Sequence, residues 1–195
     1  MKVLICTDIH CDKSALASLR ELARGVEFII CAGDMSLWGR GLDATLEVMA
    51  SWGKRVFVIH GNHEDELDTR TVCSKFENLT FFHRDVVQFK DLSLVGWGGG
   101  GFSLQDRGFE RFVEGLKISE FSRVVLVTHG PPFQTCLDEK QPGVFVGCES
   151  YKRFILKHNP LVAISGHIHE TEGAICELEG SILINPGPFG VVLDL

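Results

Sequence analysis

The chain has 195 residues, of which 45% are hydrophobic and 23% are charged, and its formal net charge is −7. This composition is typical of a globular protein, and we expect one domain over residues 1–195. No apolar stretch approaches the roughly 20 residues that a membrane span needs, so we expect no membrane association. The acidic balance disfavours an extended nucleic-acid-binding surface, but it still allows a phosphate ester to bind at a locally positive site.

Five short apolar runs predict the central strands of the fold. They lie at residues 3–6, 28–32, 56–59, 124–127 and 161–165. Each run is rich in Val and Ile and nearly continuous, which is typical of strands that are buried on both faces. Such a sheet must be covered by helices, so the runs indicate an α/β fold.

Helices and hairpins are predicted between and beside these strands. Apolar residues at helical spacing indicate helices over residues 16–23, 42–50, 109–116 and 151–158. Asp12 or Ser14 can cap the first helix, and Gly25 follows it as a stop signal. Two antiparallel hairpins are expected from the paired segments 80–89 with 92–97 and 174–179 with 181–185.

The seven cysteines do not form a recognisable metal or disulfide motif. No two of them stand in a Cys-x-x-Cys pair. Cys6 and Cys31 lie inside apolar runs, where a reduced thiol behaves as a small hydrophobe. The apolar part of the N-terminus is too short for a signal peptide. We therefore expect reduced cysteines and a cytoplasmic location.

Polar side chains follow every one of the five predicted strands. Seven of them are candidate metal ligands: Asp8, His10, Asp34, Asn62, His129, His167 and His169. Because ligands bind at the carboxyl ends of the strands in open α/β sheets, these side chains are expected to meet. Oxygen and imidazole donors without sulfur fit Mn, Fe, Co, Ni or Zn better than Ca. Seven donors exceed the needs of one tetrahedral ion and suit two ions that share a carboxylate.

The charge of such a centre favours phosphate chemistry. Two divalent cations, balanced by Asp8, Asp34 and a bridging hydroxide, leave one positive charge for a phosphodiester anion. Asn62 offers an oxygen without adding a negative charge that would weaken the metals as Lewis acids. A pair of ions about 4 Å apart can generate hydroxide near neutral pH and stabilise an in-line displacement.

Five short motifs make a family resemblance visible. They are DIH at 8–10, GD at 33–34, GNHE at 61–64, THGPP at 128–132 and GHIH at 166–169. In this order they span nearly the whole chain, and the sequence resembles the calcineurin-like metallophosphoesterases. The resemblance implies a four-layer α/β/β/α sandwich of two mixed sheets with flanking helices, and a dinuclear metal centre at the strand ends.

The resemblance also implies a role for each residue. The first metal would be held by Asp8, His10 and His169, the second by Asn62, His129 and His167, and Asp34 would bridge the two. His63 would be the catalytic general acid that protonates the leaving oxygen, or it would steady the phosphate. Manganese is the expected ion, with Fe, Ni, Co or Zn as alternatives.

Departures from relatives narrow the expected activity. Serine/threonine protein phosphatases carry GDxVDRG, whereas residues 33–39 read GDMSLWG, with Leu37 and Trp38 in place of the second aspartate and the arginine. The sequence shows no cap domain and no basic arm, which argues against a processive DNA nuclease. We therefore expect a phosphodiesterase that cleaves small phosphate esters, nucleotides among them, by attack of a metal-bridging hydroxide.

Two other classes of protein remain as alternatives. A non-catalytic scaffold could keep the fold for protein contacts, although the complete donor set and His63 argue against it. A metallo-β-lactamase fold would require HxHxDH, which the sequence lacks.

Several loop residues have two interpretations each. An aromatic side chain could stack on a base or simply pack its loop, and a cation could select phosphate or remain solvated. The aromatic candidates are Trp38, Trp97 and Phe133, and the cationic ones are Arg40, Arg84, Arg107 and Lys140. Glu64 is expected to complement a helix N-terminus, with orientation of His63 as the alternative.

Overall fold

The computed structural model describes residues 1–121 and 123–195. Its first sheet has the strand order β13-β1-β2-β3-β4, in which β1 to β4 run parallel and β13 is antiparallel to β1. The bounds of these strands are Lys2–Cys6 for β1, Phe28–Cys31 for β2, Arg55–Val58 for β3, Leu79–Phe81 for β4 and Val191–Asp194 for β13. The carboxyl ends of β1, β2 and β3 therefore lie at one edge of this sheet.

The second sheet has the strand order β11-β12-β10-β7-β6-β5. Its four inner strands run parallel, and β5 and β11 are antiparallel additions at its two edges. The bounds are Asp85–Phe89 for β5, Leu92–Trp97 for β6, Val124–Thr128 for β7, Val162–Ile164 for β10, Ile175–Leu178 for β11 and Ser181–Ile184 for β12. A separate small hairpin consists of β8 (Glu139–Gln141) and β9 (Val144–Phe145).

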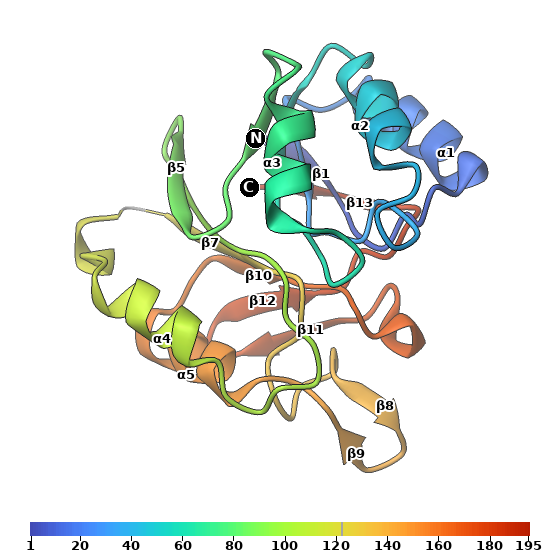
Figure 1. The fold of residues 1–195 in the computed structure, drawn as a ribbon. Helices are drawn as coiled ribbons and strands as arrows, with labels where there is room; N and C mark the ends of the chain where they lie inside the picture. The colour runs from blue at the N-terminus through green and yellow to red at the C-terminus, as the bar shows by residue number, and fades with distance from the viewer. Residues whose placement is uncertain (122) are drawn as a thin grey trace.

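Helices cover the outer face of each sheet, as Figure 1 shows. The first sheet carries α1 (Lys13–Ala23), α2 (Leu42–Ala50) and α3 (Glu66–Cys73), and the second carries α4 (Arg107–Glu114) and α5 (Glu149–His158). Two short 3₁₀ helices, η1 (Ile118–Glu120) and η2 (His169–Thr171), complete the described elements. The architecture is the four-layer α/β/β/α sandwich of two mixed sheets that the family resemblance implies.

Side chains alternate along each strand, so the buried apolar residues form three layers: one between the two sheets and one between each sheet and its helices. In β1, Val3 and Ile5 face the second sheet, whereas Leu4 and Cys6 pack against the helices of the first. In β7, Val125 likewise faces the inter-sheet layer. Because both faces are buried, strands with unbroken apolar sequences are stable only in the middle of such a sandwich.

The predicted segment 80–89 is not one strand. Its first part belongs to β4 and pairs with β3, whereas β5 begins at Asp85 and pairs with β6 in the other sheet. Between them Arg84 takes a left-handed backbone conformation (φ 54°), and the chain crosses from one sheet to the other. The hairpin of β5 and β6 and that of β11 and β12 are confirmed.

Two of the cysteines form a disulfide. Cys136, in the loop after β7, is bonded to Cys176 in β11, and their Cα atoms are 6.2 Å apart. The expectation of reduced cysteines is therefore wrong for this pair, which is separated by 40 positions and has no local spacing signal. The cytoplasmic location stays a prediction. None of the described helices is long and apolar enough to cross a membrane.

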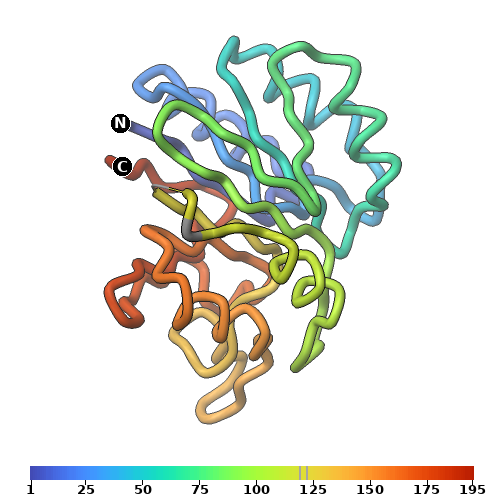
Figure 2. Tube along the Cα trace, turned by 90° about the vertical axis from the view of Figure 1, so that its left-hand side faces the viewer, coloured from blue at the N-terminus to red at the C-terminus, as the bar shows by residue number. Residues whose placement is uncertain are grey.

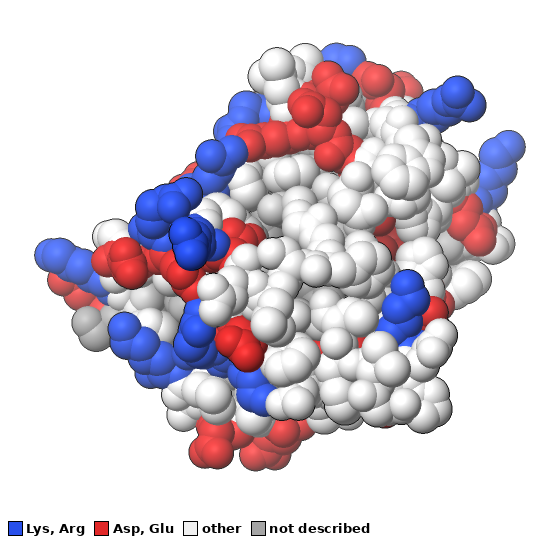
Figure 3. Space-filling model, turned by 60° about the horizontal axis from the view of Figure 1, so that its bottom comes forward, with Lys and Arg blue, Asp and Glu red and all other residues white. Residues whose placement is uncertain are grey.

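The two ends of the chain lie side by side, as Figure 2 shows. The antiparallel pairing of β13 with β1 brings them together, and the N–H of Leu195 donates to the carbonyl of Met1 at 2.9 Å. Figure 3 shows another face, where charged side chains of both signs gather mainly toward the left and upper edges and uncharged residues fill the middle.

Candidate metal centre

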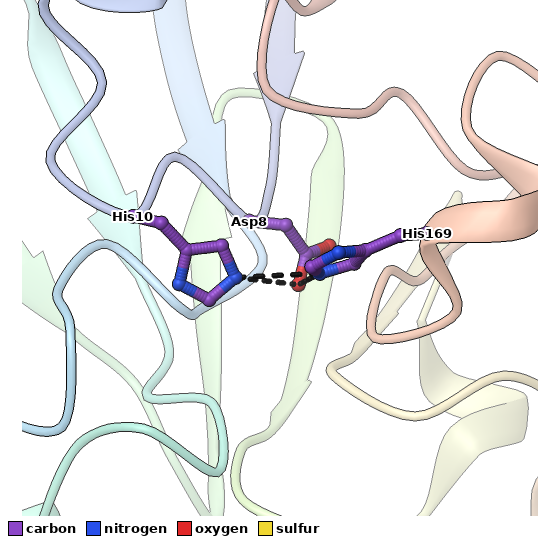
Figure 4. A group of neighbouring side chains, drawn as sticks. All are labelled: Asp8, His10 and His169. Carbon is purple, nitrogen blue, oxygen red and sulfur yellow. Dashed lines mark hydrogen bonds and ion pairs between the residues drawn. The ribbon is translucent and has the colours of Figure 1, made fainter.

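The strand ends of the two sheets bring the predicted ligands together at one place. Asp8 and His10 follow β1, and His169 begins η2. The Oδ1 atom of Asp8 lies 4.0 Å from Nε2 of His10 and 3.6 Å from Nε2 of His169 (Figure 4). The two imidazole nitrogens are 3.3 Å apart. Three donor atoms that converge so closely fit a cation between them.

Asp34 occupies the middle of the cluster. Its Oδ2 atom lies 3.8 Å from Nε2 of His10, 3.9 Å from Nε2 of His63 and 3.4 Å from Nε2 of His129. Asp34 follows β2, so it stands between the residues that follow β1 and those that follow β3 and β7. Its carboxylate therefore faces both halves of the predicted centre.

The second half of the centre is built around His129, which is fully buried. Its Nε2 atom lies 3.0 Å from Oδ1 of Asn62, and its ring centroid is 5.2 Å from that of His167. The Nδ1 atom of His129 lies 2.8 Å from the carbonyl oxygen of Ala32. An Nδ1–H that donates to this carbonyl leaves Nε2 directed at the centre, which is the usual arrangement of a histidine that binds a metal.

Two atoms of the predicted ligand set are buried without a partner. Within the part of the chain that the structure describes, Oδ1 of Asp8 and Nε2 of His167 accept no hydrogen bond. Unpaired buried polar atoms are rare because they are costly, and metal ions bound in the two halves of the ligand set would satisfy both of these. The residues present therefore fit a metal site on physical grounds.

The electrostatics of the centre are dominated by the pair of Asp34 and His129. Burial opposes the ionisation of Asp34, but the hydrogen bond and the charge of His129 outweigh it and hold the pKa of Asp34 at about 2. Burial also opposes protonation of His129, but the hydrogen bond and charge of Asp34, together with the charge of Asp8, raise its pKa to about 9. In the absence of metal, a proton on His129 thus takes the place of a cation.

The backbone turns sharply at four of the candidate ligands. Asp8, His10, Asp34 and His167 have φ values of 53°, 45°, 52° and 69°, in the left-handed region that residues with a side chain rarely adopt. Such conformations persist only where the surrounding fold imposes them, and they are concentrated at functional sites. Gly166 lets the backbone approach this site closely, because a Cβ atom at this position would overlap the carboxylate of Asp8.

Glu64 has a role that the sequence does not reveal. It is only 8% exposed, and it accepts hydrogen bonds from the backbone N–H groups of Asp34, Ser36 and Gly61 at 2.8–2.9 Å. The interpretation of Glu64 as a partner of a helix N-terminus is wrong. Asp65 caps α3 instead, by accepting from the N–H of Leu67 at 2.7 Å.

His63 lies beside Asp34 and is partly exposed. Its backbone N–H donates to Oδ1 of Asp34 at 2.9 Å, and its ring is stacked on that of Trp38, with centroids 4.0 Å apart. Beside His167, in the other half of the ligand set, the exposed ring of Phe102 has its centroid 4.8 Å from that of the histidine, and the Lys140 ammonium lies 4.7 Å above Phe102.

Two other loop candidates make contacts within the protein. Trp97 is buried, packs against Phe109 and donates from Nε1 to Asp106 at 2.7 Å, so its role is packing. Arg84 is paired with Glu66. Among the predicted catalytic and metal-binding residues, all eight are gathered at the strand ends.

Comparison with other proteins identifies the family and the fold. Residues 1–171 match the model of the calcineurin-like phosphoesterases, and this chain belongs to that family. No curated protein matches the sequence. Solved structures show the same fold at low identity.

Three of these structures illustrate the similarity. The protein TT1561 of Thermus thermophilus is 16% identical, with a TM-score of 0.78 over 95% of this chain and 88% of its own. A novel archaeal phosphodiesterase is 19% identical, with a TM-score of 0.58 over 96% of this chain and 84% of its own. Phosphopantetheinyl hydrolase of Mycobacterium tuberculosis is 13% identical, with a TM-score of 0.61 over 95% of this chain and 88% of its own. These matches establish a shared fold.

Proposed function

We propose that the chain is a dinuclear metal-dependent phosphodiesterase, with residues 1–195 as its catalytic domain. The observation that carries this proposal is the position of Asp34, whose Oδ2 atom lies within 3.9 Å of Nε2 atoms of His10, His63 and His129. A carboxylate so placed can belong to two neighbouring metal sites. The substrate is a small phosphodiester, with nucleotides included.

Each half of the ligand set would hold one divalent ion, manganese in our proposal. Asp8, His10 and His169 would hold the first, Asn62, His129 and His167 the second, and Asp34 would belong to both. Such ions supply Lewis acidity, a water nucleophile near neutral pH and positive charge for the phosphate. With only two carboxylates among the seven ligands, the protein leaves part of the metal charge for an anionic substrate.

The chain's own residues would position the ions and handle the proton. The Nδ1 atoms of His10 and His129 lie 3.0 Å and 2.8 Å from the carbonyls of Ser36 and Ala32, which fixes the direction of each Nε2 atom. His63 would protonate the leaving oxygen, because its Nε2 atom lies at the centre, 3.9 Å from Oδ2 of Asp34, while Trp38 limits the motion of its ring.

Support for a diesterase comes from two sources. One solved structure with this fold is an archaeal phosphodiesterase, at 19% identity. The centre also includes His63, which would protonate the leaving group. Protonation matters most when the leaving group is an alkoxide, which is a poor leaving group.

The proposal is tested by hydrolysis of bis-p-nitrophenyl phosphate with chelator-treated protein, with and without Mn²⁺. We expect turnover that depends on the metal and is faster than release from p-nitrophenyl phosphate. Folded protein without turnover in Mn²⁺, Fe²⁺, Co²⁺, Ni²⁺ or Zn²⁺ would support the scaffold alternative. Faster monoester cleavage would contradict the diesterase assignment.

A further inference from the structure

A strained turn lies beside His63. Leu37 and Arg40 are joined by two backbone hydrogen bonds of 3.1 and 3.2 Å, with Trp38 and Gly39 between them. Trp38 has φ 53° and Gly39 has φ 78°, and positive φ at both central positions defines a type I′ turn. Asn, Asp and Gly are favoured in such turns, whereas a bulky residue with positive φ is an outlier.

Folding alone does not account for tryptophan at this position. The residue is 74% exposed, so most of the free energy available from burying its ring is not realised. Its aromatic contact is with His63, at an interplanar angle of 22°. A residue that opposes the local backbone preference and gains little burial is expected to serve a ligand.

A cavity adjoins this ring. Leu37, Trp38 and Arg40 line a space of about 600 Å³. Its walls are an aliphatic side chain, an indole ring and one cation. No ion pair within the described part of the chain involves Arg40. A space of this size and character fits a planar group that carries polar edges.

The position of the cavity identifies which part of a substrate would enter it. In the proposed function, on which this inference rests, His63 protonates the leaving oxygen. A group attached to that oxygen that extends past His63 reaches the Trp38 ring, which is stacked on His63.

We infer that Trp38 stacks on a nucleobase of the leaving group, so that the substrates are phosphodiesters that release a nucleoside. Water adds to phosphorus, the bond from phosphorus to the nucleoside oxygen breaks, and His63 supplies the proton to that oxygen. The products are a free nucleoside and the remaining phosphate monoester. Stacking accepts any base, because every base has a flat π face.

Two esters with a single cleavable bond test the inference. Thymidine 5′-methylphosphonate and the matching ester of an abasic deoxyribose have the same leaving oxygen and differ only in the base. Wild-type protein with Mn²⁺ is expected to cleave the thymidine ester with a kcat/KM about 5 to 100 times higher, the range that one base–aromatic stack provides. Trp38→Asn and Trp38→Ala should lower this ratio to about one, mainly through KM for the thymidine ester.

Controls separate stacking from a structural role. Asn is favoured in a type I′ turn, so Trp38→Asn should melt at or above the temperature of the wild type. If Trp38 only steadies His63, both esters lose activity equally, because the leaving oxygen is the same, and the inference is overturned. Phe102→Ala removes another exposed ring and should leave the ratio unchanged; an equal loss of the ratio there would also contradict a specific role for Trp38.

p-Nitrophenyl methylphosphonate separates this inference from the proposed function. If the wild type cleaves this reference ester but not the thymidine ester, or cleaves the thymidine and abasic esters equally, the inference fails while the phosphodiesterase stands. If the reference ester is not cleaved with any divalent metal, the proposed function itself fails.

Discussion

The carboxylate of Glu64 accepts a hydrogen bond of 2.9 Å from the backbone N–H of Asp34, the residue at the middle of the candidate metal centre. The same oxygen accepts from the N–H of Gly61 at 2.9 Å, and the other oxygen accepts from Ser36. One buried side chain therefore joins the loop after β2 to the loop after β3. Through these bonds Glu64 sets the position of Asp34 relative to Asn62.

We predict that Glu64→Gln weakens metal binding about 10- to 100-fold, the usual effect of losing an outer partner of a metal ligand. The amide group would direct N–H atoms at backbone donors, and each unsatisfied buried donor costs about 1–3 kcal/mol. Metal content after dialysis and competition with a chelator measure the change. Glu47→Gln, on the exposed surface of α2, is the matched control. Unchanged metal retention in folded Glu64→Gln would remove the positioning role.

The role of Glu64 shows where prediction from sequence reaches its limit. Asp8, Asp34 and His129 could be predicted as neighbours, because each follows a buried strand and parallel strands end at one edge of a sheet. The partners of Glu64 at Asp34 and Ser36 lie about 30 positions away in the chain, so the local pattern indicates a helix terminus or a contact with the adjacent His63, and neither of these partners. Cys136 and Cys176, 40 positions apart, were missed for the same reason.

Backbone strain is the second feature that the sequence does not show. His10 and Trp38 have positive φ values, yet neither residue type signals a left-handed conformation as glycine does. The packed sheets impose these conformations, and local propensity gives no hint of them. Residues 80–89 illustrate the same limit on a larger scale, since β-propensity continues through the crossing at Arg84.

Replacement of Asp34 should affect both metals together. We predict that Asp34→Ala binds neither ion tightly, because the carboxylate faces both halves of the ligand set. Elemental analysis of protein purified in excess Mn²⁺ gives the number of ions per chain. Asp34→Asn keeps the shape of the side chain, so it serves as a control for misfolding of Asp34→Ala. It should also lose tight binding of both ions. Two ions retained per chain in either variant would refute the shared position.

His63→Ala should separate proton transfer from metal binding. The residue is outside the proposed ligand set, so we expect unchanged metal content and a fall in kcat of about 10²- to 10⁴-fold for poor leaving groups. Esters with p-nitrophenol as the leaving group need little protonation and should lose far less activity. The comparison uses p-nitrophenyl and alkyl esters of methylphosphonate. Equal losses for both esters would mean that His63 binds the phosphate instead of protonating the leaving oxygen.

Metal binding should release a proton from His129. Burial lowers the pKa of this residue, but its hydrogen bond to Asp34 and the nearby negative charges raise it to about 9 in the metal-free protein. At pH 7 the ring is therefore protonated, and a metal can bind Nε2 only after the proton leaves. We predict release of about one proton for this step, and an apparent affinity that rises about tenfold per pH unit up to pH 9.

The stability of the metal-free protein should fall as the pH rises above 7.5, whereas its affinity for metal should rise. The pKa of His129 is higher in the folded chain than the ordinary value of 6.5, so its pairing with Asp34 stabilises the fold fully below pH 6.5. This contribution is lost as the pH rises through about 9. The buried histidines with lowered pKa values (His60, His83 and His167, each about 4) are neutral in both the folded and unfolded chain above about pH 7.5. Thermal unfolding from pH 7.5 to 9.5 should therefore show a falling melting temperature, and the fall should be smaller in His129→Gln. The protons released from His129 on metal binding are counted in a separate experiment, by calorimetric titration with Mn²⁺ at pH 7 in buffers of different ionisation enthalpy. If no proton is released at pH 7, His129 is already neutral in the metal-free protein, and both predictions fail.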